Sequence, residues 1–343
     1  MYIMEAKAAI LKEFGKDLVV ESVPVLEPSQ DEVLICVRAS GLCGTDIHIQ
    51  EGKISTVSLP YVPGHEMAGE VIQVGKNVEN VKVGDCVCVH IDIVCKTCKF
   101  CTMGRPNLCA NLVRIGFERN GSHQEYAVVP ADNVFKIGKS ISFEEAAIIP
   151  DAIACTYHAI RTQAKVRAGD KVCILGVGGL GFHEIQIAKF LGAEVYATSR
   201  RNEKIKISRD FGADYGINTL KYDLVREIKR ITGGDMCDVV VDNIGIESSI
   251  QLGLDTCRPG GKVLIVGYTD VVFQADYQDM MKNEKEIIGV RGSTAQEMAE
   301  VIELIENRSI IPYVYKTYSL MEINKAIKHL KEGRSLGRSV IVM

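Results

Sequence analysis

The chain has 343 residues, of which 47% are hydrophobic and 24% charged, and it carries a formal net charge of −4 at pH 7. These ordinary values favour a globular protein of two domains, and the charge gives no reason to expect nucleic acid or an anionic membrane as a partner. Since no apolar run reaches the roughly 18 residues of a membrane span and the N-terminus lacks a signal-peptide layout, we expect a cytoplasmic protein.

The first half of the chain contains short segments in which apolar and polar residues alternate, separated by turn residues. Examples are residues 31–40, 69–78, 84–91 and 124–129. Alternation with frequent turns is typical of strands with one buried face. The pattern predicts a β-rich, barrel-like domain.

From about residue 152 strands alternate with helices. Strands are predicted at 171–176, 194–198, 214–217, 238–242, 262–267 and 286–290, and helices near 179–191, 202–212, 220–231 and 247–257. This alternation predicts a parallel sheet with crossover helices, and six strands match the doubly wound dinucleotide-binding fold.

The chain then continues with a helix at 295–308, a strand at 314–320, a helix at 322–333 and a final strand at 338–343. This tail exceeds what the parallel sheet needs, so we expect it to return to the first domain. The predicted division is residues 1–151 with 290–343 for the β domain, and 152–289 for the cofactor domain.

A glycine-rich turn, GVGGLG, lies between the first predicted strand of the cofactor domain and its helix. Such glycines permit a tight turn and let backbone N–H groups approach a pyrophosphate. The candidate cofactor-binding residues of this turn are Gly176, Gly178, Gly179, Leu180 and Gly181.

The end of the next strand indicates which dinucleotide is bound. An acid that holds the ribose 2′-hydroxyl of NAD is expected near Ser199, but Ser199, Arg200 and Arg201 occupy this place, with Lys204 just beyond. A small hydroxyl followed by cations suits a 2′-phosphate. We therefore predict NADP(H) in preference to NAD(H); the alternative is that these cations are only the solvated start of a helix.

The sequence contains 12 cysteines, and four of them cluster in one loop, residues 95–109. The spacing of Cys95, Cys98, Cys101 and Cys109 favours a metal over disulfides. Four thiolates suit a closed, structural zinc site, although an iron–sulfur cluster also takes closely spaced cysteines.

Two further stretches, GLCGTDIH at 41–48 and PGHE at 63–66, contain candidate ligands for a second metal. Cys43 and His65 could belong to a catalytic zinc site, which takes three protein ligands and leaves one position for substrate. Taken singly, each could equally be an ordinary buried cysteine or histidine.

In combination and in order, these motifs resemble those of the zinc-dependent medium-chain alcohol dehydrogenases over essentially the whole chain. They are CGTDxH, PGHE, the four-cysteine loop, the glycine turn and the closing GRxV. The resemblance implies a GroES-like β domain, a Rossmann domain, one catalytic and one structural zinc, and a homodimer or homotetramer.

The resemblance also implies residue roles. Cys43 and His65 would bind the catalytic zinc, with Asp46 orienting His65 and Glu66 able to reach the metal during exchange. Thr45 would contact the substrate oxygen, and His48 would end the proton relay. Arg338 would contact the cofactor pyrophosphate, or would simply be a surface charge before the final strand.

The third zinc ligand departs from the cysteine that is most common in this family. The resemblance places Asp151 there, with Cys155 as the rival one turn further on. From the sequence, Ser142 and Glu145 form a capping box, Pro150 breaks that helix and Asp151 starts a new one. Asp151 could therefore also be a plain N-cap.

The implied function is reversible hydride transfer between NADP(H) and an alcohol, aldehyde or ketone of small size. A polyol or sugar dehydrogenase of the same superfamily and an NAD(H)-preferring alcohol dehydrogenase are the alternatives. A zinc-independent enoyl reductase or a non-catalytic relative is disfavoured, because such proteins usually lack CGTDxH and PGHE together.

Overall fold

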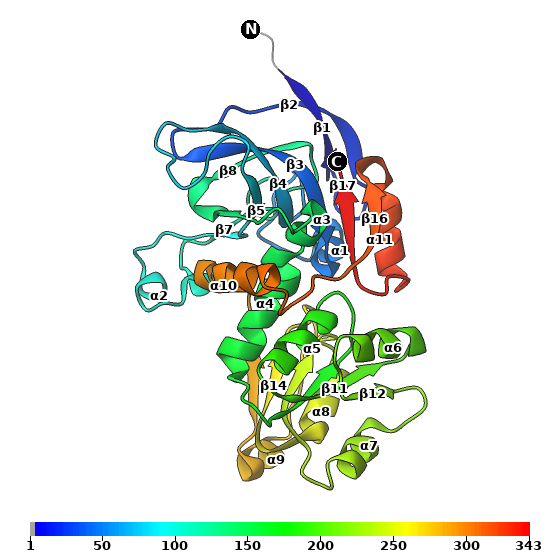
Figure 1. Ribbon diagram of the computed structural model, residues 1–343. Coiled ribbons are helices and arrows are strands. Elements are labelled where there is room, and N and C mark those ends of the chain that lie inside the picture. Colours follow the sequence, from blue (N-terminus) through cyan, green and yellow to red (C-terminus); the bar gives the residue numbers. More distant parts are fainter. Residues whose placement is uncertain (1–3) are drawn as a thin grey trace. The chain divides into compact units, whose positions relative to one another are not determined.

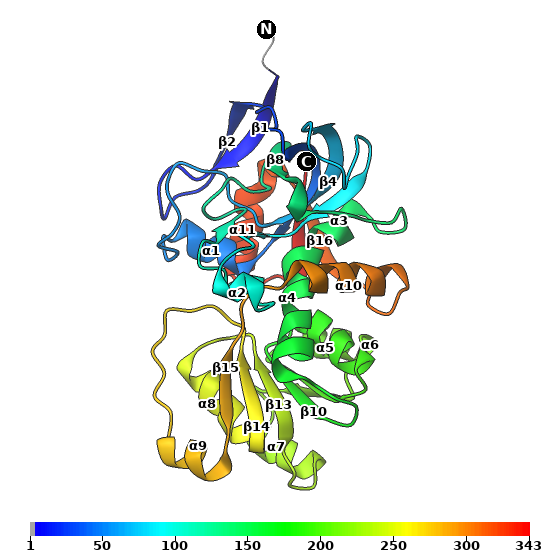
Figure 2. The ribbon, with the colours of Figure 1, turned by 90° about the vertical axis from the view of Figure 1, so that its left-hand side faces the viewer.

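The computed structural model describes residues 4–343, which divide into two compact units (Figures 1 and 2). The first unit holds the chain up to Ala154 together with Gly292–Arg308 and Pro312–Met343. The second holds Cys155–Arg291 and Ser309–Ile311. Among the described residues no helix is both long and apolar enough to cross a membrane.

The first unit is built on a largely antiparallel sheet, which confirms the predicted β-rich domain. Its main path runs β16-β17-β3-β4-β5-β9, and β8 also pairs with β3. The strands are β3 (Glu32–Leu42), β4 (Glu66–Val74), β5 (Cys86–Val89), β8 (Tyr126–Pro130), β9 (Val134–Lys136), β16 (Val314–Ser319) and β17 (Arg338–Val342). Two further pairs are β1 (Glu5–Ile10) with β2 (Val19–Pro24), and β6 (Asp92–Ile93) with β7 (Val113–Arg114).

The C-terminal tail supplies two neighbouring strands of this sheet. β17 pairs with β16 on one side and antiparallel with β3 on the other, with Ser339 opposite Leu42 (Figure 1). The last strand is therefore interior to the sheet, where both rows of its backbone groups find partners. Arg338, its first residue, lies beside the end of β3, next to Cys43.

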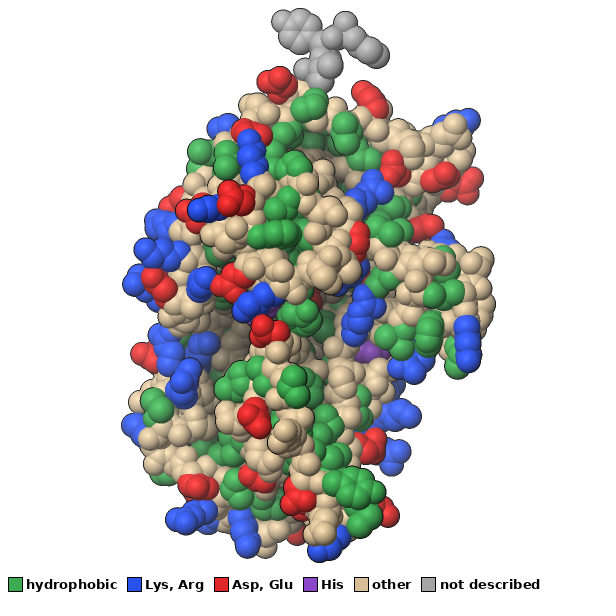
Figure 3. All heavy atoms as spheres, turned by 180° about the vertical axis from the view of Figure 1, so that it is seen from behind, with side chains coloured by type: hydrophobic (Ala, Val, Ile, Leu, Met, Phe, Trp, Pro, Cys, Tyr) green, Lys and Arg blue, Asp and Glu red, His purple; other side chains and the backbone are tan. Residues whose placement is uncertain are grey.

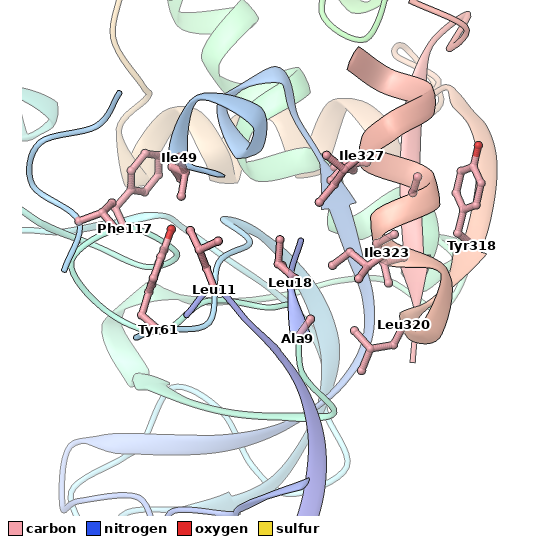
Figure 4. Close-up of a cluster of buried hydrophobic side chains, with 14 of the residues drawn as sticks. Ala9, Leu11, Leu18, Ile49, Tyr61, Phe117, Tyr318, Leu320, Ile323 and Ile327 are labelled. Atoms are coloured by element: carbon pink, nitrogen blue, oxygen red, sulfur yellow. The ribbon is translucent and has the colours of Figure 1, made fainter. Parts of the chain in front are cut away.

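One hydrophobic cluster joins the two ends of the chain. Helix α11 (Ile323–Lys331) buries Ile323 and Ile327 in the same cluster as Leu11 and Leu18 from the N-terminal segment (Figure 4). Ile49 of α1 (Gly44–Gln50) joins this cluster, so the helix that carries the CGTDxH motif is anchored by burial of its apolar face.

The remaining helices of the first unit lie between strands along the chain. They are α2 (Lys99–Thr102), η1 (Pro106–Leu108), η2 (Ala131–Asn133), α3 (Phe143–Ala147), α10 (Ala295–Glu306) and η5 (Leu320–Glu322). Side chains of both charge signs intermingle on the face drawn in Figure 3. No surface of a single charge sign is seen on that face, in agreement with the small net charge.

The second unit contains the six predicted strands in one parallel sheet, ordered β12-β11-β10-β13-β14-β15. They are β10 (Lys171–Leu175), β11 (Glu194–Ser199), β12 (Tyr215–Asn218), β13 (Cys237–Asp242), β14 (Cys257–Ile265) and β15 (Glu286–Gly289). The helices are α5 (Gly181–Phe190), α6 (Asn202–Asp210), α7 (Leu224–Ile231), α8 (Glu247–Thr256) and α9 (Tyr277–Asn283). The strand order reverses between β10 and β13, and ligands bind at the carboxyl ends of strands at such a reversal. The glycine turn follows β10 at this point.

The segment around Asp151 differs from the sequence prediction. Ser142 and Glu145 form the predicted capping box of α3, but Asp151 does not begin a new α-helix. It lies inside a π-helical turn, η3 (Ile149–Ile153), followed by α4 (Ala154–Tyr157) and a second π-helical stretch, η4 (His158–Ala164). Pro150 offers no N–H and cannot continue an α-helical ladder, and the wider π turn keeps the chain helical past it.

Candidate metal and cofactor sites

Three ligand atoms from distant parts of the first unit converge. Cys43 caps the start of α1 after β3, His65 directly precedes β4, and Asp151 projects from the π turn. Cys43 Sγ lies 3.3 Å from Asp151 Oδ2, and His65 Nε2 lies 3.7 Å from the same oxygen. Zinc ligands at 2.0–2.3 Å in tetrahedral geometry are roughly 3.3–3.8 Å apart, so these spacings fit one shared metal ion.

Within the described part of the chain, this group of potential metal ligands comprises Cys43, His65 and Asp151. Cys155, the rival third ligand, is buried on α4 and does not belong to the group. A thiolate, an imidazole and a carboxylate give three ligands, which is the number that leaves a fourth position for substrate.

Asp46 lies beside His65, on the side of the imidazole that faces away from the ligand group. Asp46 Oδ2 accepts a hydrogen bond of 2.8 Å from the backbone N–H of Cys43, and Oδ1 lies 3.8 Å from His65 Nδ1. His65 thus directs Nδ1 to Asp46 and Nε2 to the ligand group, as metal-binding histidines usually do. Burial alone would raise the pKa of Asp46, but the imidazoles of His65 and His123 hold it below its usual range.

Arg338 lies among the carboxyl groups of this site. Its guanidinium donates to Asp151 Oδ2 at 2.8 Å and lies 3.0 Å from Glu66 Oε1, and the residue is only 4% exposed. Burial opposes ionisation of Asp151, yet its hydrogen bond with His65 and the charge of Arg338 hold its pKa below the usual range. Contact of Arg338 with a cofactor pyrophosphate stays a prediction.

Glu66 is fully buried and held away from solvent by two donors. Its Oε1 accepts from the Ala152 backbone N–H at 3.1 Å in addition to the contact with Arg338. Burial raises the pKa of Glu66 to about 8; the charge of Arg338 opposes this rise, and the nearby Asp151 carboxylate adds to it. One guanidinium thus serves two carboxyl groups.

Thr45 and His48 lie on α1, three residues apart on one helical face. Thr45 Oγ1 is 3.6 Å from Cys43 Sγ, so this hydroxyl stands at the edge of the ligand group. Both side chains are half-buried. Their placement is compatible with the roles predicted for them.

The loop that carries His65 is held by a second segment that sequence reasoning missed. The backbone N–H groups of Gly121, Ser122 and His123 donate to Val62, Gly64 and Pro63, respectively, at 2.7–3.0 Å. The Ser122 hydroxyl donates to the Glu66 carbonyl at 3.1 Å, and His123 Nε2 lies 3.7 Å from Asp46 Oδ1. In the sequence only the histidine of GSHQEY, His123, could have pointed to this segment. Its distance from Asp46 along the chain matches no known motif spacing.

The four clustered cysteines form a separate group. Cys98 Sγ lies 3.6 Å from Cys101 Sγ and 3.9 Å from Cys109 Sγ, and Cys109 Sγ lies 3.5 Å from Cys95 Sγ. Sulfurs bound to zinc at about 2.3 Å in a tetrahedron would be about 3.8 Å apart, whereas disulfide sulfurs are about 2.0 Å apart. The donor set and the spacing both fit a closed zinc site.

The glycine turn and the cations after β11 come together in the second unit. Gly176 has φ of +82°, and its N–H donates to Thr198 Oγ1 at 3.3 Å. A Cβ at Gly178 would lie 3.3 Å from Lys204 Nζ, so this ammonium stands directly over the turn. Burial, with the charge of Arg201 adding to it, lowers the pKa of Lys204.

The other predicted 2′-phosphate contacts are arranged differently. Ser199 is almost fully buried, and its Oγ accepts from the Arg201 N–H at 3.1 Å. Arg200 is exposed, and Arg201 lies 3.7 Å from Glu203. Of the predicted cations, Lys204 is the one that lies within 4 Å of a Cβ built at Gly178.

Comparison with known proteins agrees with this fold. Residues 29–139 match the alcohol dehydrogenase GroES-like domain, and residues 179–307 match the zinc-binding dehydrogenase domain. An alcohol dehydrogenase of Geobacillus stearothermophilus is 33% identical over 98% of each chain. An L-threonine 3-dehydrogenase of Pyrococcus furiosus is 36% identical over 99% of each chain. The crystal structure of an NAD-dependent alcohol dehydrogenase superposes with a TM-score of 0.94 at 29% identity, covering 98% of this chain and 99% of that one.

A GroES-like domain and a Rossmann domain define the class of two-domain nicotinamide oxidoreductases. Within this class the chain belongs to the zinc-type medium-chain dehydrogenase/reductase family. The family and the fold predicted from the motifs are thereby confirmed.

Close backbone packing around the His65 loop gives a stability prediction. A Cβ at Gly121 would overlap the Gly64 carbonyl oxygen, whereas a Cβ at Gly44 would have no heavy atom within 4 Å. We expect Gly121→Ala to lower the free energy of unfolding by about 1–3 kcal/mol or more. Gly44→Ala, on α1, should change it by no more than about 1 kcal/mol. Chemical denaturation of both variants measures this; equal effects would contradict the steric argument.

Proposed function

We propose that this oxidoreductase interconverts an alcohol and an aldehyde or ketone with NADP(H) in a zinc-dependent reaction. The observation that carries the proposal is the convergence of Cys43, His65 and Asp151 with spacings that fit one tetrahedral ion. When bound, zinc acts as a Lewis acid that polarises a carbonyl or lowers the pKa of an alcohol.

The protein's own groups hold this site and move the proton. Asp46 keeps Nδ1 of His65 turned away from the ligand group, and Arg338 keeps Asp151 ionised and ready to bind a cation. The Thr45 hydroxyl can contact the substrate oxygen, and His48, one helical turn further, can receive the proton. Glu66 is held by Arg338 and Ala152 through Oε1, and its Oε2 has no hydrogen-bond partner among the described residues.

We propose zinc at both ligand groups, and this gives the first test. Asp151→Ala and Cys98→Ser should each remove one zinc per chain, measured by plasma mass spectrometry. Asp151→Ala should lower the rate of NADPH oxidation with an aldehyde panel by about 10³-fold or more, since Lewis-acid catalysis supplies several kcal/mol. Cys98→Ser should lower thermal stability and leave the remaining zinc in place.

Cys36→Ser is the matched control, because Cys36 is a free half-buried cysteine outside both ligand groups. It should retain both zinc ions and full activity. Full activity of Asp151→Ala, or of wild type stripped of all metal, would exclude the zinc mechanism.

The preference for NADP(H) rests mainly on Lys204. This partly buried ammonium stands over Gly178, and no acid occupies position 199. The alternative is an NAD(H)-preferring alcohol dehydrogenase. The similar structure of an NAD-dependent alcohol dehydrogenase supports this alternative. A polyol, sugar or amino-alcohol substrate, as in the threonine dehydrogenase relative, is the alternative on the substrate side.

The cofactor ratio tests this preference. Wild type should have a higher kcat/KM with NADPH than with NADH, which lacks the 2′-phosphate. Lys204→Met should lower that preference about 10- to 100-fold, because a charge-assisted contact contributes roughly 1.5–3 kcal/mol. Ser199→Asp should reverse it. Lys206→Met, exposed on the same helix, should leave it unchanged; a wild-type preference for NADH would contradict the assignment.

We further propose that the second unit pairs with another copy through β15. Among the described strands it has one neighbour, β14, and the segment before it exposes Val272, Tyr277 and Met281 at 84%, 75% and 58%. An unpaired strand next to large exposed apolar side chains is a common pairing edge.

Light scattering after size exclusion should show a dimer or tetramer for wild type. Replacing Val272 and Tyr277 together by Glu should shift the mass towards the monomer. Leu220→Glu, at a position exposed to 72% on the same unit, should not. A monomeric wild type, or an unchanged mass for the double variant, would contradict this interface.

A further inference from the structure

Two polar side chains meet in the second unit where β13 ends and α5 begins, outside the cofactor contacts assigned above. Glu184, in the first turn of α5, has no solvent exposure. Asn243 directly follows β13, and its Nδ2 donates to Glu184 Oε2 at 2.6 Å. A carboxyl group is therefore buried with a neutral amide as its hydrogen-bonding partner.

The hydrogen bond between Asn243 and Glu184 leaves one oxygen of each side chain to be accounted for. Glu184 Oε1 and Asn243 Oδ1 are both buried without a hydrogen-bond partner among the described residues. If Glu184 is ionised, both atoms are pure acceptors, and neither can satisfy the other. A proton on Oε1 turns that atom into a donor, and Asn243 Oδ1 is an acceptor that lacks one.

We infer that Glu184 is a neutral carboxylic acid that forms a closed acid–amide pair with Asn243 and positions the loop after β13 against the glycine turn. In this pair Nδ2–H donates to Oε2 and Oε1–H donates to Oδ1. The proposal goes beyond the proposed function, and its cofactor part rests on dinucleotide binding at that turn.

The electrostatic surroundings agree with the neutral form. Burial raises the pKa of Glu184 to about 8; the Asn243 hydrogen bond opposes this rise, and the Asp242 carboxylate adds to it. Asp242 is itself satisfied by the N–H groups of Ile244 and Gly245 and by the Ser249 hydroxyl. The elements packed around α5 also carry Lys171, Glu194, His158, Arg161, Glu203 and Lys204. None of these supplies an ion pair to Glu184 in the described structure.

The pair ties together two parts of the cofactor crevice. The loop after β13 packs on the glycine turn, because a Cβ at Gly176 would lie 2.8 Å from Ile244 Cγ1. The Asn243 backbone N–H also donates to Leu175 O, at the end of β10, at 3.2 Å. Glu184 and Asn243 are thus positioning residues for the wall of the crevice.

The proton on Glu184 should be linked to cofactor affinity. An ionised carboxylate in the first turn of α5 would stand near a pyrophosphate at that helix terminus, and the bound anion would favour the neutral form. The pKa of Glu184 would then be higher in the complex than in the free protein. By linkage, dinucleotide affinity should fall as the pH rises above about 8.

Glu184→Gln tests the positioning role, because its amide can donate to Asn243 Oδ1 at every pH. Dissociation constants for NADPH and NADH would be measured by fluorescence titration between pH 6.5 and 9.5. Wild-type affinity should fall at high pH by a factor of about 10 for each unit by which the cofactor raises the Glu184 pKa. Glu184→Gln should lose this part of the fall, whereas Glu194→Gln should retain it. Titration of Lys204 is common to all three proteins and cancels in the comparison.

Infrared spectroscopy reads the proton directly, with no cofactor present. At pH 6.5 the difference spectrum of wild type minus Glu184→Gln, in which the signal of the buried Glu66 carboxyl group cancels, should show a protonated-carboxyl carbonyl band that disappears as the pH rises through 8. Absence of this band overturns the acid–amide pair. A band with parallel affinity profiles in wild type and Glu184→Gln overturns the positioning role. If no dinucleotide binds at any pH, the proposed function fails, and the band still decides the pair.

Discussion

The first unit depends on one buried cation, Arg338, that lies among acids. Asp46, Glu66, Asp151 and the Cys43 thiol are all within the same small region, and Arg338 contacts two of the carboxyl groups at 2.8 and 3.0 Å. Removing one partner of a buried ion pair typically costs 3–5 kcal/mol, because the other charge is left uncompensated. The guanidinium of Arg338 therefore offsets part of the cost of burying these acids beside the candidate metal ligands.

This requirement explains the order of the chain. The candidate ligands come from residues 43–151, but the guanidinium beside them comes from the first residue of the last strand, β17. β17 pairs with β3 directly beside Cys43, so the same backbone ladder that completes the sheet also delivers the guanidinium. The parallel sheet of the second unit is inserted between them in sequence, and the tail must return for the first unit to be complete.

Local patterns explain which parts the sequence could predict. The six parallel strands, the glycine turn and the four-cysteine loop follow from periodicity and spacing, which are properties of short segments. The π turn at Asp151 was not predicted, since a proline normally ends a helix and the widened ladder depends on packing around it. His123 and the countercharge role of Arg338 were missed for a related reason. Their partners Asp46 and Asp151 lie far away in sequence, and no spacing rule connects such pairs.

Buried carboxyl groups in the two units differ in whether they keep their charge. Asp151 keeps its charge because His65 and Arg338 stabilise the ionised form against burial. Glu66 shares that same guanidinium with Asp151, and its pKa rises to about 8. Glu184 is hydrogen-bonded to an amide instead of a cation. Burial raises its pKa to about 8 as well. A buried acid here that meets both an imidazole and a guanidinium, as Asp151 does, can serve as a metal ligand; one that meets only an amide, as Glu184 does, becomes a hydrogen-bond donor.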